Sequence, residues 1–161
     1  MNHLEKLKQQ LMVKPVVQER ERIAVVIKGE RRPRVRREKE TIKKYYFLDT
    51  GILGLFLTDQ ATKLLENQIY IELRRRGEKP YFLKRKTEVD FYIPEKGELI
   101  QVSYSISDPD TLEREVKGLR AAMKELDIKN SLIITYDEEK EIEVQEGIIK
   151  VIPAWKWLLN C

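Results

Sequence analysis

Residues 88–103, EVDFYIPEKGELIQVS, decide the fold that this sequence predicts. Two runs of alternating apolar and polar side chains flank a turn that contains Pro94 and Gly97, which is the pattern of a β-hairpin. Its apolar face is expected to carry Val89, Phe91, Ile93, Ile100, Val102 and Tyr104.

The opposite face of the predicted hairpin is polar. Glu88 and Asp90 share that face on the first strand, and Gln101 and Ser103 share it on the second. Oxygen ligands of this kind suit hard divalent cations such as Mg²⁺. The face is therefore a candidate metal site, and an ordinary solvated face is the alternative.

Segments on both sides of the hairpin carry their own signals. Asp59 is the expected N-cap of a helix over residues 60–76 that Gly77 ends, and Asp108 with Pro109 starts a second helix. Strands are expected at residues 80–83, 131–136, 140–144 and 148–153, with a short helix over 153–159. The order from residue 60 is α-β-β-β-α-β, followed by a C-terminal hairpin and a short helix. It predicts an α/β domain with a mixed sheet flanked by helices.

The N-terminal third has a different character. We expect a helix at residues 2–11, a short strand at 22–29 and then a basic connector interrupted by Pro33. The expected division is therefore an N-terminal segment over residues 1–42 and a compact domain over residues 43–161.

Composition and length bound the remaining classes. A chain of 161 residues can bury a core, and 42% hydrophobic with 36% charged residues suits a soluble globular protein. The single Cys161 excludes an internal disulfide and a Cys-rich zinc site, and we do not expect the lone His3 to be a ligand or a base. The sequence has no apolar run of about 18 residues and no signal peptide, so we expect a cytoplasmic protein without a membrane partner.

Positive charge is concentrated between residues 28 and 44. This block holds nine Lys or Arg against three Glu, a formal charge of +6 in a chain whose net charge is +4. Such a block is typical of phosphate-backbone binding, and a solvated linker is the alternative. The candidate nucleic-acid contacts are Arg31, Arg32, Arg34, Arg36, Arg37, Arg74, Arg75, Lys84 and Lys86.

One acidic residue of the first predicted helix borders an apolar stripe. Ile69, Tyr70 and Leu73 share a helical face with Glu66. A carboxylate in that position loses solvation unless a cation or hydrogen-bond donors compensate it. Glu66 is therefore either a third site ligand beside Asp90 and Gln101, or a border residue that extends into solvent.

Five stretches, read in order, resemble the C-terminal domain of a prokaryotic, largely archaeal, group of AAA+ ATPases. They are KYYFLDTGIL, LLENQIYIELRRRG, EVDFYI, LIQVSYSISDPDTLEREVKGL and IPAWKWLL, and they span roughly residues 43–160. That domain is identified as a member of the PD-(D/E)xK nuclease superfamily, which has a restriction-endonuclease-like fold and includes archaeal Holliday junction resolvases.

The resemblance implies roles for particular residues. In the superfamily a helix Glu, a strand Asp and a Glu-x-Lys on the next strand bind one or two Mg²⁺ ions and position the attacking water. Glu66 matches the helix Glu and Asp90 the strand Asp, whereas Gln101 and Ser103 stand where Glu and Lys are expected. Gln brings no negative charge and Ser no cation, so the resemblance implies a degenerate site that binds Mg²⁺ or Mn²⁺ weakly. Lys84 or Lys86 is a candidate substitute for the missing cation.

Residues 22–36, RIAVVIKGERRPRVR, bear a weaker resemblance to the strand and P-loop that open such ATPases. Gly29, Arg31 and Arg32 fit the pattern G-x-R-R-x-G-K-[ST]. Its last three positions are replaced, as Arg34, Val35 and Arg36. The chain is therefore expected not to bind ATP by this route. A remnant of an ATPase start and a chance similarity both remain open.

Three functions follow as hypotheses. The first is a nuclease-like domain that binds DNA without efficient cleavage. The second is an active Mg²⁺- or Mn²⁺-dependent endonuclease for branched or duplex DNA. The third is a non-enzymatic module that forms a homodimer or joins an ATPase partner, with Trp155 and Trp157 as interface or core anchors.

Overall fold

The computed structural model of the chain describes residues 16–17, 21–24, 36–39, 45–46, 61–84 and 88–159. The described side chains are those of Tyr46, 61–83 and 88–159. The expected helix at residues 2–11, the N-cap Asp59, Lys86 and residues 29–35 of the P-loop-like stretch lie outside the described residues.

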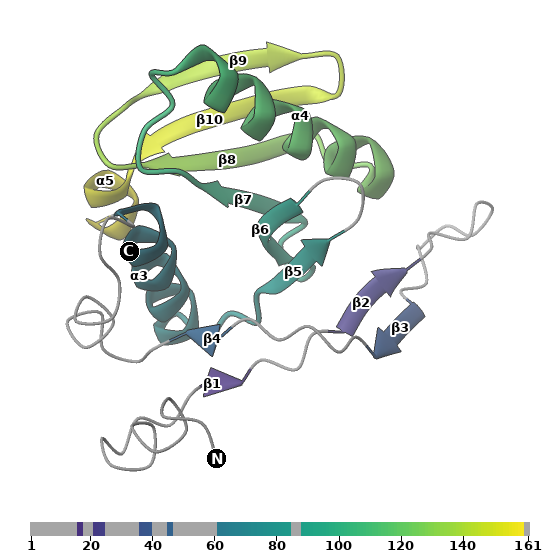
Figure 1. The fold of residues 1–161 in the computed structure, drawn as a ribbon. Helices are drawn as coiled ribbons and strands as arrows, with labels where there is room; N and C mark the ends of the chain where they lie inside the picture. The colour runs from purple at the N-terminus through teal and green to yellow at the C-terminus, as the bar shows by residue number, and fades with distance from the viewer. Residues whose placement is uncertain are drawn as a thin grey trace, which may run out of the picture.

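A six-stranded mixed sheet forms the centre of the fold (Figure 1). Its strands, in spatial order, are β5 (Tyr81–Lys84), β6 (Glu88–Ile93), β7 (Glu98–Val102), β8 (Asn130–Thr135), β10 (Gly147–Pro153) and β9 (Lys140–Val144). Strand β8 is parallel to both β7 and β10, whereas the outer pairs are antiparallel. The α/β class and the mixed sheet are thus confirmed.

Helices cover both faces of this sheet (Figure 1). Helix α3 (Ala61–Arg75) and the short α5 (Ala154–Leu159) pack on one face, and α4 (Pro109–Leu126) packs on the other. Local signals set their ends. Gly77 follows α3 with a φ of 80°, and Asp108 caps α4 by accepting the Thr111 N–H at 2.8 Å.

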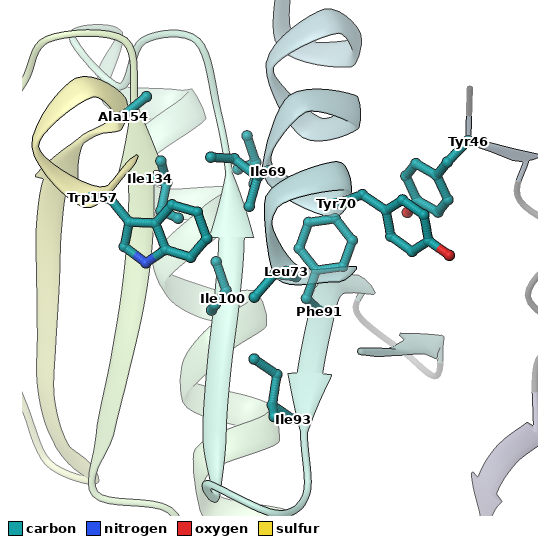
Figure 2. Close-up of a cluster of buried hydrophobic side chains, with 11 residues drawn as sticks. Tyr46, Ile69, Tyr70, Leu73, Phe91, Ile93, Ile100, Ile134, Ala154 and Trp157 are labelled. Carbon is teal, nitrogen blue, oxygen red and sulfur yellow. The ribbon is translucent and has the colours of Figure 1, made fainter. Parts of the chain in front are cut away.

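The face that α3 and α5 cover holds the aromatic part of the core. Figure 2 shows Tyr46 beside Tyr70 of α3, with Phe91 of β6 next to them. The rings of Tyr46 and Tyr70 stack with centroids 4.0 Å apart. This stack fixes the strand that contains Tyr46 against the helix that carries Glu66.

The N-terminal strands are short. Strand β1 (Val16–Val17) pairs with β4 (Tyr45–Tyr46), and β2 (Glu21–Ala24) pairs with β3 (Arg36–Lys39), both antiparallel. Strand β2 covers part of the strand expected at 22–29. Strand β3 lies inside the expected connector, so part of the basic block is strand. The β1–β4 pair joins a strand of the expected N-terminal segment, residues 1–42, to a strand of the expected domain, residues 43–161.

One expectation for the hairpin is wrong. Val89 does not share a face with Phe91 and Ile93; it packs with Leu99 and Leu119 on the α4 side. The physical reason is local irregularity, because β5 and β6 shift register within this stretch. Tyr104, expected on the apolar face, is 40% exposed beyond the end of β7.

Candidate functional site: a cleft where two strands diverge

Main-chain pairing between β6 and β7 is replaced by side-chain bonds beside Asp90. The paired positions run from Ile93 and Glu98 to Phe91 and Ile100. At the next position the Asp90 N–H donates to the Gln101 side-chain oxygen, at 3.1 Å. The Val102 N–H donates to Asp90 Oδ2, at 3.0 Å. Two predicted site residues thus bridge the strands where they diverge.

Helix α3 brings the third predicted residue to this place. Glu66 is buried, with 3% of its surface exposed. Its carboxylate accepts a hydrogen bond from the Tyr46 hydroxyl at 2.9 Å and one from Lys63 Nζ at 3.0 Å. The alternative, that Glu66 is a border residue that extends into solvent, is therefore wrong. Its desolvation is compensated by a cation and a hydroxyl donor.

Lys63 is the cation beside Glu66. It lies one helical turn before Glu66, with about half of its side chain exposed. Burial alone would lower the pKa of Lys63, but the carboxylates of Glu66, Asp90 and Glu88 outweigh it and raise that pKa above its ordinary value. The ammonium therefore stays charged and interacts favourably with acids of both α3 and β6.

Helix α4 contributes a further acid to the group. Gln101 Nε2 donates to Glu115 Oε2 at 2.7 Å, and Glu115 is 8% exposed. The guanidinium of Arg114 donates twice to Glu115 Oε1, at 2.7 and 3.2 Å. Gln101 thus connects the Asp90 backbone to Glu115 through its two amide ends.

These residues line one cleft of about 450 Å³. Helix α3 contributes Thr62, Lys63 and Glu66, the strands contribute Glu88, Asp90, Gln101 and Val102, and α4 contributes Arg114, Glu115 and Gly118. Four acids and two bases among them give a formal charge of −2. The start of α3 is held against the end of β7 because the Tyr104 N–H donates to Thr62 Oγ1, at 3.1 Å.

Ser103, the fourth predicted residue, does not line this cleft. It is buried, and its hydroxyl donates to the Ser105 carbonyl at 2.9 Å in the segment after β7. The resemblance expects a lysine at position 103, but the side chain there is bonded to the neighbouring backbone and not directed to the cleft.

The predicted nucleic-acid contacts fall into two groups. Arg74 and Arg75 lie in the last turn of α3, where Arg74 donates to the Glu78 carbonyl and Arg75 pairs with Glu72. They are about two helical turns from Glu66. The backbones of Arg36, Arg37 and Lys84 belong to β3 and β5. Arg31, Arg32, Arg34 and Lys86 lie outside the described residues.

The cleft does not have the ligand arrangement of a metal centre. Within the parts of the chain that the structure describes, no three Asp, Glu, His or Cys side chains gather closely enough to hold a metal ion. The acids Glu66 and Glu115 are instead bonded to donors of the chain itself, namely the Lys63 ammonium, the Gln101 amide and the Arg114 guanidinium. The residues present therefore do not fit the Mg²⁺ or Mn²⁺ ion that the resemblance implies.

Sequence reasoning missed Lys63 and Glu115. A signal for Lys63 was its spacing of three residues from Glu66 on one helical face. A signal for Glu115 was its place beside Leu112 and Leu119 on the apolar stripe of α4. The first signal names Glu66 but not Asp90 or Glu88, and the second does not name Gln101, because those partners lie on other elements.

Comparisons with known proteins identify a longer archaeal relative. An uncharacterized protein of Methanocaldococcus jannaschii, MJ1544, is 40% identical over 131 residues, which cover 73% of this chain and 29% of that protein. The chain thus spans less than a third of the relative's length. No protein-family model matches the chain. No solved structure matches it either.

No helix within the described ranges has both the length and the apolar character needed to cross a membrane.

Proposed function

We propose that residues 43–161 form a restriction-endonuclease-like domain and that the chain binds DNA, chiefly through the basic segment before this domain, without cleaving it efficiently. The observation that carries the proposal is the convergence of Glu66, Asp90 and Gln101 from α3, β6 and β7 in one cleft. The element order from α3 to α5 and the mixed sheet agree with that fold.

Three features of the structure argue against efficient hydrolysis. Gln101 is neutral and already joined to Glu115, and the Ser103 hydroxyl is turned to Ser105. The acids among the described residues do not converge as metal ligands. A phosphodiester would therefore meet neither the metal ion nor the lysine that the resemblance calls for at these positions.

The DNA contact is proposed for the basic segments, not for the cleft. The cleft lining has a formal charge of −2 and would repel phosphate, whereas residues 28–44 carry +6. Binding through Lys and Arg releases counterions from DNA, so affinity should fall steeply with salt.

Fluorescence anisotropy with labelled duplex and four-way-junction DNA tests the binding. We expect saturable binding at low salt that weakens with salt. Changing Arg31, Arg32, Arg34, Arg36 and Arg37 to Gln should remove most of the binding. The slope of the logarithm of the binding constant against the logarithm of salt concentration should become shallower by about 0.9 per lost phosphate contact. The matched control neutralises five exposed lysines elsewhere, namely Lys117, Lys124, Lys129, Lys140 and Lys150. No binding at low salt, or equal loss in both variants, would contradict the proposal.

Cleavage is tested separately, with supercoiled plasmid and four-way-junction DNA in Mg²⁺ or Mn²⁺. We expect no cleavage above that of an Asp90→Ala variant. Cleavage that Asp90→Ala abolishes would instead establish the second hypothesis, an endonuclease with a variant site. Cleavage that persists in Asp90→Ala would indicate a contaminant.

One observation favours self-association as a second function. On α5, Trp155 and Leu159 are 58% and 74% exposed and lie four residues apart on one helical face. Exposed apolar side chains of this size are typical of protein interfaces. Light scattering of the wild type and of a Trp155→Lys variant tests it, and a monomeric wild type at high concentration would dismiss it.

A further inference from the structure

Each buried acid of the cleft has a compensating partner within the chain. Glu66 receives Lys63 and the Tyr46 hydroxyl, Asp90 receives the Val102 N–H, and Glu115 receives Gln101 and Arg114. A buried carboxylate without such partners would be costly. The cleft therefore balances its acids with protein donors.

Lys63 occupies the central place in this arrangement. Its ammonium contacts Glu66 at 3.0 Å and is attracted by Asp90 and Glu88 of the neighbouring strand. A divalent cation between α3 and β6 would use the same carboxylates as ligands. The ammonium and such a cation are therefore in competition for one position.

Gln101 plays the matching part on the other side of the cleft. Its amide oxygen accepts the Asp90 N–H while its amide nitrogen donates to Glu115. A glutamate at position 101 has no hydrogen to donate and would face Glu115 as a second negative charge. A metal ion or a proton would then be needed between the two carboxylates.

We infer that the Lys63 ammonium and the Gln101 amide take the place of a divalent cation in this cleft, which is therefore a closed, metal-independent form of an acidic site. The inference concerns cation uptake alone, so it stands or falls separately from DNA binding. It also specifies what opens the site: loss of the ammonium, and replacement of the amide by a carboxylate.

Titration with Mn²⁺, followed by the electron paramagnetic resonance of the free ion, tests this inference on the full chain. The variants are Lys63→Gln, Gln101→Glu and the two combined. Lys63→Arg keeps the charge. Lys129→Gln is the matched control, because it breaks an exposed ion pair of equal length, 3.0 Å to Asp127, outside the cleft. Circular dichroism checks that each variant is folded.

The wild type, Lys63→Arg and Lys129→Gln should show equal, weak Mn²⁺ uptake. Lys63→Gln should bind Mn²⁺ at least about tenfold more tightly, a difference of about 1.4 kcal/mol, and the double variant more tightly still. Mg²⁺ should compete with Mn²⁺ in the double variant. Wild-type uptake as tight as that of Lys63→Gln, or no gain in any folded cleft variant, would overturn the inference.

Discussion

Asp90 and Gln101 are held together by the backbone of one and the side chain of the other. The Asp90 N–H donates to the Gln101 amide oxygen at 3.1 Å, while the Asp90 carboxylate accepts the N–H of Val102 at 3.0 Å. Both residues are buried. These two hydrogen bonds take the place of backbone pairing between β6 and β7 at this position. Asp90 and Gln101 therefore each have a structural role in addition to any chemical one.

Changing Gln101 to Glu should destabilise the chain in a pH-dependent manner. The new carboxylate would face Glu115 in place of a donor that now lies 2.7 Å from it. The neighbouring negative charge raises the pKa of the introduced carboxyl, so the folded state holds a proton that the unfolded state releases. Stability should therefore fall as pH rises through the raised pKa, with a loss of about 3 kcal/mol at neutral pH. Urea unfolding at acidic and neutral pH measures it.

The matched control exchanges the two groups. In Gln101→Glu combined with Glu115→Gln, one amide again faces one carboxylate, and most of the lost stability should return. A double variant as unstable as the sum of its single changes would show that the pair does not interact in this way.

Features of the fold that depend on neighbouring residues in the sequence were predicted more accurately than features that depend on contacts between strands. Local signals were reliable: Gly77 ends α3, Asp108 caps α4, and the hairpin lies where its alternation placed it. The side of the sheet on which Val89 lies was missed, because a register shift changes the facing of a strand and leaves no mark in the alternation.

The candidate site divides in the same way. Glu66, Asp90 and Gln101 were singled out from the helical stripe and from the alternation of the hairpin, and the family resemblance then implied their roles. The structure brings all three to one cleft. Lys63 and Glu115 were missed because part of their role lies in interactions between elements: Lys63 with Asp90 and Glu88 of β6, and Glu115 with Gln101 of β7. Ser103 was placed by strand spacing and by the resemblance, and neither takes account of the chain after β7, where the Ser105 carbonyl accepts its hydroxyl.

Removal of the Tyr46 hydroxyl should destabilise the folded chain, because buried Glu66 would lose one of its hydrogen-bond donors. Tyr46→Phe keeps the stack on Tyr70 but removes the donor that lies 2.9 Å from the carboxylate. We expect a loss of about 2 kcal/mol in the free energy of unfolding, typical of a hydrogen bond to a charged group. Chemical unfolding measures it, with Tyr136→Phe, on an exposed ring, as the control. Equal effects of the two changes would contradict the role given to Tyr46.

Glu72 should give the chain an acid-sensitive part of its stability. Hydrogen bonds from Arg75, together with Arg76, outweigh burial and lower the pKa of Glu72 to about 2. A lowered pKa means that the unfolded state takes up the proton first as pH falls. The stabilisation is thus complete above about pH 4.5 and is lost between there and about pH 2.

The variant Glu72→Gln tests this dependence. It should cost about 2 kcal/mol at neutral pH, and the difference from the wild type should shrink as pH falls below about 4.5. Arg76 also lies 4.2 Å from the Trp157 ring and donates to the Trp157 carbonyl, so near-ultraviolet circular dichroism should report loosening of α5. The exposed Glu113→Gln is the control. A difference that does not change with pH would contradict the role assigned to Glu72.

Gly147 should be the glycine that least tolerates a side chain among those that the structure describes with positive φ. Its φ is 154°, and a Cβ built there would lie 2.0 Å from the Lys129 carbonyl oxygen, which also accepts the Ile148 N–H at 2.8 Å. Gly147→Ala must therefore displace backbone at the start of β10, and we expect a loss of more than about 3 kcal/mol. Gly97→Ala is the matched control, because its φ of 59° is also positive but open space surrounds it. It should cost only about 1 kcal/mol. Thermal and urea unfolding compare the two variants. Similar losses of stability would show that the approach of Gly147 to Lys129 does not constrain the turn between β9 and β10.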